Sequence, residues 1–245
     1  KDPFIISYLN FEKDQNFETR IKFSGYKDTT KQFFLKSLSL DENKNTIVAN
    51  GIQLSSKLKI KSIDNINANY IDTQDEKNIF NIKKNNKRYI VKGDSFNGEN
   101  LIEDILFSDE EKNYFDEDFE LILNIKNINL DREFNLKNLT GNLIFKNQKL
   151  VEGSLVGDFP GEKKMNFSVR TNDNKIITTL FLDFAEPIVK KYKFIKGFDS
   201  GVLDFYSIKD ANVSNSTLKI YDFKLKELPT LTKLLTLASL QGIAD

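Results

Sequence analysis

The sequence predicts a mainly β, antiparallel fold, and three features of the chain lead to that prediction. Apolar and polar residues alternate in many short runs, which is the period of a strand with one apolar face. Clusters of Asn, Asp, Lys and Gly separate the runs at intervals of roughly ten residues, as turns do between short strands. No stretch shows the strand–helix–strand alternation of a parallel α/β sheet. We therefore expect about a dozen or more short strands and about three short helices.

The N-terminal half shows its clearest alternation at residues 17–23, where Phe17, Ile21 and Phe23 share one face. Ser24 and Gly25 are expected to form the turn after this strand, and residues 84–87 the tip of a later hairpin. Strands are expected at residues 4–11, 17–23, 32–40, 46–54, 79–82 and 88–91, and a short helix at residues 101–106. The apolar pattern also continues through residues 58–70.

The alternation is stronger in the C-terminal half, and it is strict in residues 164–170. Gly141 is expected to mark a bend or bulge within residues 134–145, because glycine inside a strand often does so. Residues 157–161 are expected to form a turn, and residues 185–195 a short helix that opens around Pro187. Strands are expected at residues 119–125, 134–145, 150–156, 164–170, 176–184, 201–208 and 216–225.

An acidic stretch divides the chain near its middle. Asp109, Glu110 and Glu111 open it, and Asp116, Glu117 and Asp118 close it. We expect a solvated loop here rather than a catalytic pair or a calcium site, because the spacing of an EF-hand loop is absent. The expected division is an N-terminal β-rich portion at residues 1–108, ending in a short helix, and a C-terminal β portion at residues 109–245. The two portions could equally form one continuous domain, and we expect the chain to be a fragment of a longer protein.

Several strands carry one clean apolar face, and this face allows two interpretations. In a sandwich or barrel the apolar face is core, whereas in an open curved sheet it lines an apolar groove. Periodicity does not separate the two cases. If the sheet is open, the candidate residues for contact with a lipid in the groove are Leu121, Leu123, Ile125, Leu143, Phe145, Phe167, Val169, Leu180 and Leu182.

Composition excludes several classes of function. Lys plus Arg and Asp plus Glu each number 36, so the chain has no basic excess for nucleic acid. The absence of His and Cys rules out thiol nucleophiles, Ser–His–Asp triads and the usual zinc sites. We expect no enzymatic activity, no cofactor and no metal.

The last 25 residues join a strand to an apolar helix. Tyr221, Phe223 and Leu225 alternate with polar residues, and Pro229 then suits the first turn of a helix. The helix packs on the sheet, caps an apolar groove, or docks on a part of the protein outside this chain. The residues expected on its apolar, capping face are Leu231, Leu234, Leu235 and Ala238.

This C-terminal segment also carries a family resemblance. The run formed by Asp222-Phe223, Pro229, Leu234-Leu235, Ala238-Ser239-Leu240 and Gly242-Ile243 is similar to the C-terminal signature of the AsmA-like proteins of Gram-negative bacteria, in particular the YhdP-type branch. Gly93-Asp94-Ser95-Phe96, followed by the helix expected at residues 101–106, resembles a second pattern of that family.

The resemblance implies a fold, a place and a function. It implies a curved, elongated, trough-like sheet with an apolar interior, in a periplasmic module anchored to the inner membrane by a segment outside this chain. The implied partners are phospholipid acyl chains and components of the inner and outer membranes, and the implied function is non-enzymatic phospholipid transport or outer-membrane homeostasis. The alternative is a β-sandwich module of the cell envelope that binds protein or glycan, although the chain lacks the Trp platforms common in glycan binders.

Overall fold

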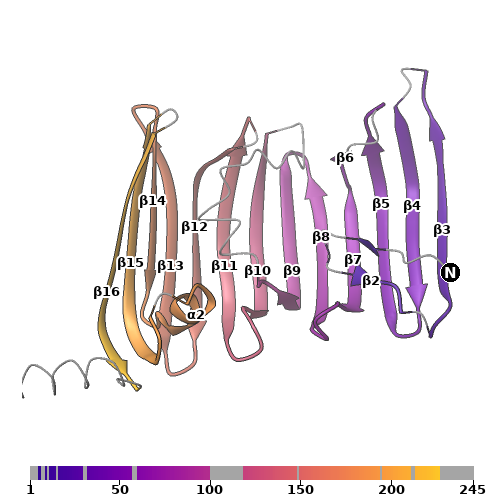
Figure 1. Ribbon diagram of the computed structural model, residues 1–245. Coiled ribbons are helices and arrows are strands. Elements are labelled where there is room, and N and C mark those ends of the chain that lie inside the picture. Colours follow the sequence, from indigo (N-terminus) through magenta and orange to yellow (C-terminus); the bar gives the residue numbers. More distant parts are fainter. Residues whose placement is uncertain are drawn as a thin grey trace, which may run out of the picture.

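The computed structural model is built around one large β-sheet (Figure 1). It describes residues 5–6, 9, 11–14, 16–29, 32–56, 60–99, 118–147, 149–193, 195–210 and 213–226. Within these residues, 14 strands form a single sheet in the order β16-β15-β14-β13-β12-β11-β10-β9-β8-β7-β5-β4-β3, and β6 pairs with β5 beside this path. Strands that are consecutive in sequence are thus neighbours in the sheet, except that β7 pairs with β5 in the main path.

Each half of the chain contributes seven strands to the large sheet. In the N-terminal half they are β3 (Thr19–Lys27), β4 (Phe33–Glu42), β5 (Asn45–Leu54), β6 (Ile60–Ser62), β7 (Asn65–Ile71), β8 (Lys77–Asn85) and β9 (Arg88–Asn97). In the C-terminal half they are β10 (Phe119–Asn129), β11 (Asn135–Lys146), β12 (Lys149–Phe159), β13 (Lys163–Asn172), β14 (Lys175–Leu182), β15 (Phe198–Asp210) and β16 (Val213–Leu225).

Neighbouring strands are antiparallel except for one pair, because β9 and β10 run parallel. A parallel pair cannot be joined by a tight turn and needs a crossover of a dozen or more residues. The chain supplies this length in residues 98–118, which connect the two strands. The sheet therefore stays hydrogen-bonded across the middle of the chain.

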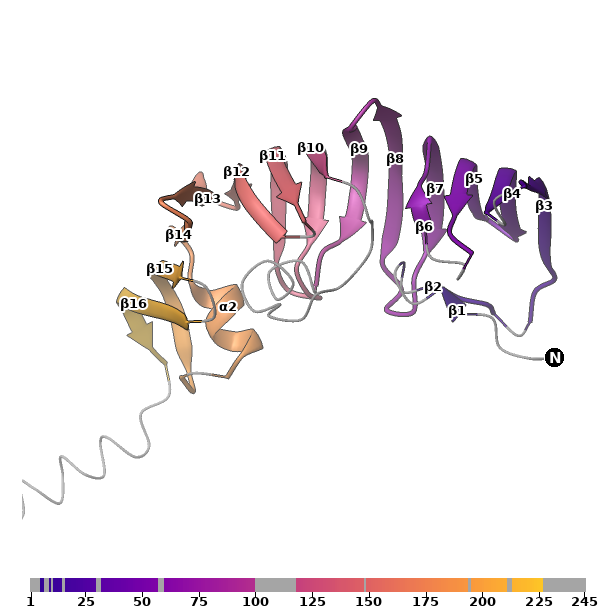
Figure 2. The same cartoon turned by 90° about the horizontal axis from the view of Figure 1, so that it is seen from above.

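The sheet curves from one edge to the other, so that it has a concave and a convex face (Figure 2). Two small elements lie on the concave side. One is a two-stranded sheet formed by β1 (Ile5–Ile6) and β2 (Phe11–Glu12), and the other is the helix α2 (Glu186–Lys191). The curvature gives the two faces different surroundings, although the sheet is a single layer.

Local sequence signals explain where the helix α2 begins and ends. Pro187 lies in its first turn, where its missing N–H costs no hydrogen bond, and Lys190 and Lys191 lie in the last turn, where positive charge is favoured. Ile188 and Val189 are buried against the sheet. The carboxylate of Glu186 pairs with Lys190 (2.8 Å) and accepts the backbone N–H of Ser200 (3.1 Å), which attaches the helix to β15.

The mainly β, antiparallel prediction is confirmed, and so is a short helix within residues 185–195. Four expectations were wrong in detail. Ser24 and Gly25 form no turn, because β3 continues through them with a bulge opposite. Within residues 157–161, β12 continues as far as Phe159. Residues 4–11 were expected as one strand, whereas Ile5–Ile6 and Phe11–Glu12 pair as two. The parallel pair of β9 and β10 was not foreseen.

Three other expectations lie outside the described residues. These are the short helix at residues 101–106, the division between residues 108 and 109, and the C-terminal helix with Leu231, Leu234, Leu235 and Ala238.

Gly141 allows a close approach of two backbones and gives a first test of the sheet. Its φ is +148°, and a Cβ at this position would lie 2.0 Å from the carbonyl oxygen of Ser154 on β12. We expect Gly141→Ala to lower the free energy of unfolding by about 3 kcal/mol, from backbone strain and overpacking together. Gly161 is the matched control, since it also has positive φ (+78°) but meets no atom within 4 Å, and Gly161→Ala should cost only about 1 kcal/mol. Chemical denaturation measures both, and equal losses would contradict the close approach.

Candidate functional site: the concave face of the sheet

A row of apolar residues crosses the whole sheet on its concave face, one residue from each strand of the main path. Each member is the register partner of the next, so the row is continuous in the hydrogen-bonded lattice. We call it the central row, and it consists of Phe23, Leu38, Ala49, Ile66, Ile82, Val91, Leu123, Gly141, Leu155, Phe167, Leu180, Phe205 and Leu218.

A second apolar row lies two residues away along each strand, on the side of α2. We call it the lower row. It is interrupted only between Leu139 and Gly157, where a bulge shifts the register of β11 and β12. Its members are Ile21, Leu40, Ile47, Ala68, Phe80, Gly93, Ile125, Leu139, Gly157, Met165, Leu182, Leu203 and Ile220.

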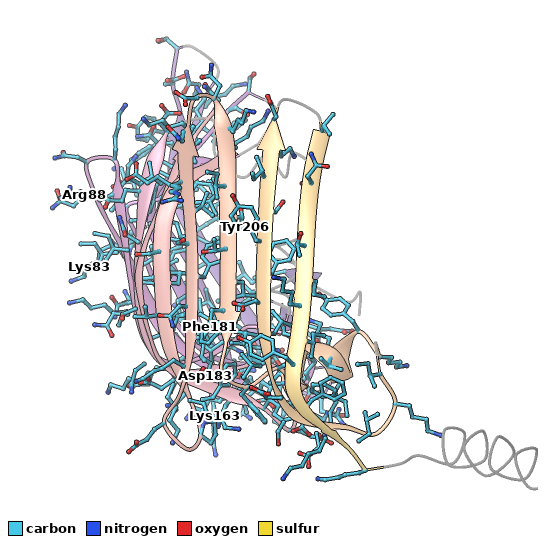
Figure 3. The ribbon with its side chains drawn as sticks, turned by 90° about the vertical axis from the view of Figure 1, so that its left-hand side faces the viewer. Lys83, Arg88, Lys163, Phe181, Asp183 and Tyr206 are labelled. Carbon is cyan, nitrogen blue, oxygen red and sulfur yellow. The ribbon has the colours of Figure 1, made fainter. Side chains whose placement is uncertain are left out.

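The convex face has the opposite character. The row beside the central row, one residue away on each strand, is polar at ten of thirteen positions: Lys22, Ser39, Val48, Asn67, Asn81, Lys92, Asn124, Thr140, Val156, Asn166, Phe181, Asp204 and Lys219. Lys83 and Arg88 point outward from this face in Figure 3. Arg88 pairs across strands with Glu120 (2.6 Å). Because side chains alternate between faces along a strand, register alone sorts the sheet into an apolar and a polar side.

The nine predicted groove residues all lie on the concave face, in one hydrophobic cluster. Leu123, Phe167 and Leu180 belong to the central row, and Ile125 and Leu182 to the lower row. Leu121, Leu143 and Val169 lie one row above, and Phe145 stacks on Phe119 with 4.7 Å between ring centroids. Leu121 and Phe145 are half-buried, and the other seven are buried. The structure thus brings the nine together, mostly with little open surface.

The two ends of the rows are open. In β3, at one edge of the sheet, Phe23 is 73% exposed, and Ile21 is exposed as well. In β16, at the other edge, Leu218 is 45% exposed. Both strands lack a neighbour on their outer side among the described residues. The apolar face is therefore most accessible where the sheet ends.

The small sheet of β1 and β2 covers the lower row at the N-terminal end. Phe11 is fully buried there and meets the ring of Tyr70 edge-on, with centroids 6.0 Å apart. The Tyr70 hydroxyl donates to the carbonyl oxygen of Leu9 (2.9 Å). Burial, reinforced by the charge of Asp72, raises the pKa of Tyr70, so the hydroxyl keeps the proton that it donates. Glu42 completes the attachment by accepting the backbone N–H of Asp14 (3.1 Å).

The helix α2 covers the lower row at the other end, through Ile188, Val189 and the preceding Ala185. On the other side of the central row, away from α2, the concave face becomes polar between β13 and β16. Val169 is followed across the strands by Thr178, Ser207 and Ser216, and the two serine hydroxyls hydrogen-bond to each other (2.9 Å). The apolar face is therefore bounded by covers on one side and by hydroxyl groups on part of the other.

The concave face presents apolar side chains, with serine hydroxyl groups at part of its border. No group of three or more Asp and Glu residues in the described part of the chain is arranged to hold a metal ion. Among the same residues, no helix has the length and hydropathy needed to cross a bilayer. Comparisons with protein-family models, with curated proteins and with solved structures returned no match.

Sequence reasoning identified apolar residues in the middle of the concave face and missed those at its ends and in its covers. The alternation in β10, β13 and β14 identified which residues share a face, but it did not show which strands are neighbours. Ile21 and Phe23 were recognised as apolar strand residues, yet their exposure at an edge depends on the order of strands. Phe11 gave no signal as a cover, because a single Phe in a short run has no period.

Two adjacent residues of β12 test the sorting of the faces. Leu155 lies in the central row and is fully buried, whereas Val156 lies on the convex face and is 47% exposed. We expect Leu155→Ala to lower the free energy of unfolding by about 2–5 kcal/mol, because it removes buried methyl groups and leaves a cavity. Val156→Ala should change it by about 0.5 kcal/mol at most. Urea unfolding of both variants measures this, and similar losses would mean that the faces are assigned wrongly.

Proposed function

We propose that this chain is a non-enzymatic module that binds lipid acyl chains along the concave face of its sheet, which acts as a trough. The continuity of the central and lower rows carries this proposal. Two adjacent apolar rows extend from β3 to β16, while the convex side of the same strands is mostly polar. A core that only stabilises the fold needs no apolar continuity out to exposed positions at both edges, whereas a path for apolar chains does.

The dimensions support a path rather than a single pocket. Thirteen strands spaced about 4.8 Å apart extend over roughly 58 Å. One acyl chain occupies about half of a bilayer's hydrocarbon core of about 30 Å. The rows are thus several acyl chains long, which suits movement along the sheet better than storage of one ligand.

The energetics support an apolar ligand. Phe23, Ile21 and Leu218 expose apolar surface next to buried members of the same rows, and contact with an acyl chain would remove that surface from water. Each methylene group so buried contributes about 0.8 kcal/mol. An acyl chain that starts from an exposed end has continuous apolar contacts to follow inward, provided that the buried side chains shift to admit it.

The wider function follows from the resemblance of the C-terminal segment to AsmA-like proteins. On that basis we propose a periplasmic module, anchored to the inner membrane by a segment outside this chain. It would take part in phospholipid transport between the inner and outer membranes, or in outer-membrane homeostasis, with components of both membranes as partners.

A second candidate is a module that binds another protein of the cell envelope. The edges of β3 and β16, which have no outer neighbour among the described residues, favour it, because an exposed edge strand offers N–H and C=O groups to a further strand. Fourteen of the described strands form one large sheet, and the remaining pair, β1 and β2, is too small to be the second sheet of a sandwich. A glycan ligand has less support, since the chain contains no Trp.

Photo-crosslinking at neighbouring residues tests the lipid proposal. A photoreactive amino acid at Phe23, Phe205 or Leu218 would lie on the concave face, and at Lys22, Tyr206 or Lys219 on the convex face, one residue away on the same strand. With vesicles of radiolabelled phospholipid, we expect label at the three concave positions at least about tenfold above their partners, because only that face offers apolar contacts. Equal labelling of both faces, or none in folded protein, would contradict the proposal and favour the protein-binding module.

A further inference from the structure

A polar cavity lies below the lower row, between the helix α2 and the ends of β9 and β10. Its volume is about 490 Å³, within the usual range of small-molecule sites. Four segments line it: the turn between β7 and β8, the end of β9, the turn between β10 and β11, and the last turn of α2. The lining residues are Gln74, Glu76, Asn97, Glu99, Asn129, Asp131, Arg132, Glu133, Lys190 and Lys191.

A buried hydrogen-bond network holds one wall of this cavity. The Asn97 side-chain amide donates to the carboxylate of Asp72 (2.7 Å) and to the amide oxygen of Gln74 (2.6 Å). Asn78 donates to the same carboxylate (3.1 Å) and accepts the backbone N–H of Asn97 (2.8 Å). Asp72, Asn78 and Asn97 are all buried. A network satisfied in this way fixes the positions of the polar groups before any ligand arrives.

The opposite wall is held by the two lysines of α2. Lys190 pairs with Glu133 (3.2 Å) and lies over the ring of Phe134, with 5.1 Å between its Nζ and the ring centroid. Lys191 donates to the backbone oxygen of Glu99. These contacts span from the helix to the ends of β9 and β11, so the cavity and the apolar cluster under α2 share a boundary.

The charges that line the cavity are of both signs. Glu76, Glu99, Asp131 and Glu133 supply four carboxylates, and Arg132, Lys190 and Lys191 supply three cations. A simple anion would meet the carboxylates, and a simple cation would meet the lysines and the arginine. A ligand with one phosphate and one ammonium group can satisfy both sets, through charge-assisted hydrogen bonds.

The distance from the cavity to the apolar rows fits an amphipathic ligand. Asn129 lines the cavity, and Ile125 of the lower row lies four residues earlier on β10, which is about 13 Å along the strand. That distance is about the length of one acyl chain in a bilayer leaflet. A polar head in the cavity therefore leaves its acyl chains within reach of the rows.

From this geometry we infer that the cavity binds the zwitterionic phosphate–ammonium head group of a lipid whose acyl chains contact the concave face. Arg132, Lys190 and Lys191 would hold the phosphate, and Glu76 and Glu99 the ammonium. The inference rests on the proposed function for the acyl chains, but it assigns a separate site and a class of head group.

Calorimetry with soluble short-chain lipids tests this inference on the unaltered protein. The probes are dihexanoyl-phosphatidylethanolamine, dihexanoyl-phosphatidylglycerol, dihexanoylglycerol and free phosphoethanolamine. We expect the phosphatidylethanolamine to bind about tenfold more tightly than either of the other dihexanoyl probes, because only it meets both sets of charges. Free phosphoethanolamine should bind more weakly than the lipid, since it lacks the apolar contacts.

Substitutions then locate the site. Arg132→Gln combined with Lys191→Gln should lower the affinity for phosphatidylethanolamine about tenfold and leave that for dihexanoylglycerol unchanged. Lys175→Gln is the control, because it removes a lysine that pairs with Asp210 at the far end of the strands. A thermal unfolding midpoint close to that of the unaltered protein confirms that each variant is folded.

Each outcome has one meaning for this site. Equal affinity for all three dihexanoyl probes would overturn the head-group site and leave the acyl-chain proposal standing. Tight binding of free phosphoethanolamine, equal to that of the lipid, would assign the cavity to a soluble zwitterion and overturn the lipid head group. Absence of binding by every dihexanoyl probe would overturn both proposals.

Discussion

The separation of the sheet into an apolar concave face and a mostly polar convex face depends on the register of its strands. A shift of one residue in any strand pairing would move that strand's apolar set to the other face. From β3 to β16 the register keeps an apolar residue or glycine on the concave side of every strand in the main path. The parallel pair of β9 and β10 is part of this alignment, since Val91 and Leu123 are partners across it. The sheet therefore departs from antiparallel pairing at this one place without breaking the apolar row.

The covers give the concave face an asymmetry that alternation alone would not create. The small sheet of β1 and β2 attaches near Tyr70, α2 attaches near β15, and a cavity of mixed charge lies between β9, β10 and α2. All three lie on the side of the lower row. An amphipathic molecule could thus have its polar part on that side and its apolar part across the rows, an arrangement that a uniformly apolar face would not specify.

The sequence predicted much of the fold because strand existence is a local property. Met165, Phe167 and Val169 alternate strictly with polar residues, and β13 formed there as expected. The errors concern non-local properties. Gly25 looks like a turn residue, but pairing with β4 keeps it in β3, with a bulge to absorb the irregularity. The direction of β10 relative to β9 depends on a crossover that no periodicity reveals. The nine groove candidates were placed on one face correctly, whereas their burial required knowledge of the curvature and the covers.

Native mass spectrometry of the folded protein, after incubation with phospholipid vesicles and their removal, tests the central claim most directly. The account predicts an added mass that equals one or more intact phospholipids. It also predicts that this mass is lost when Leu218 and Phe205, at one open end of the central row, are both replaced by Asp, but not when Lys219 and Tyr206 on the convex face are. Protein that stays folded and carries no lipid mass under these conditions would contradict an apolar path on the concave face, and the rows would then be only a core.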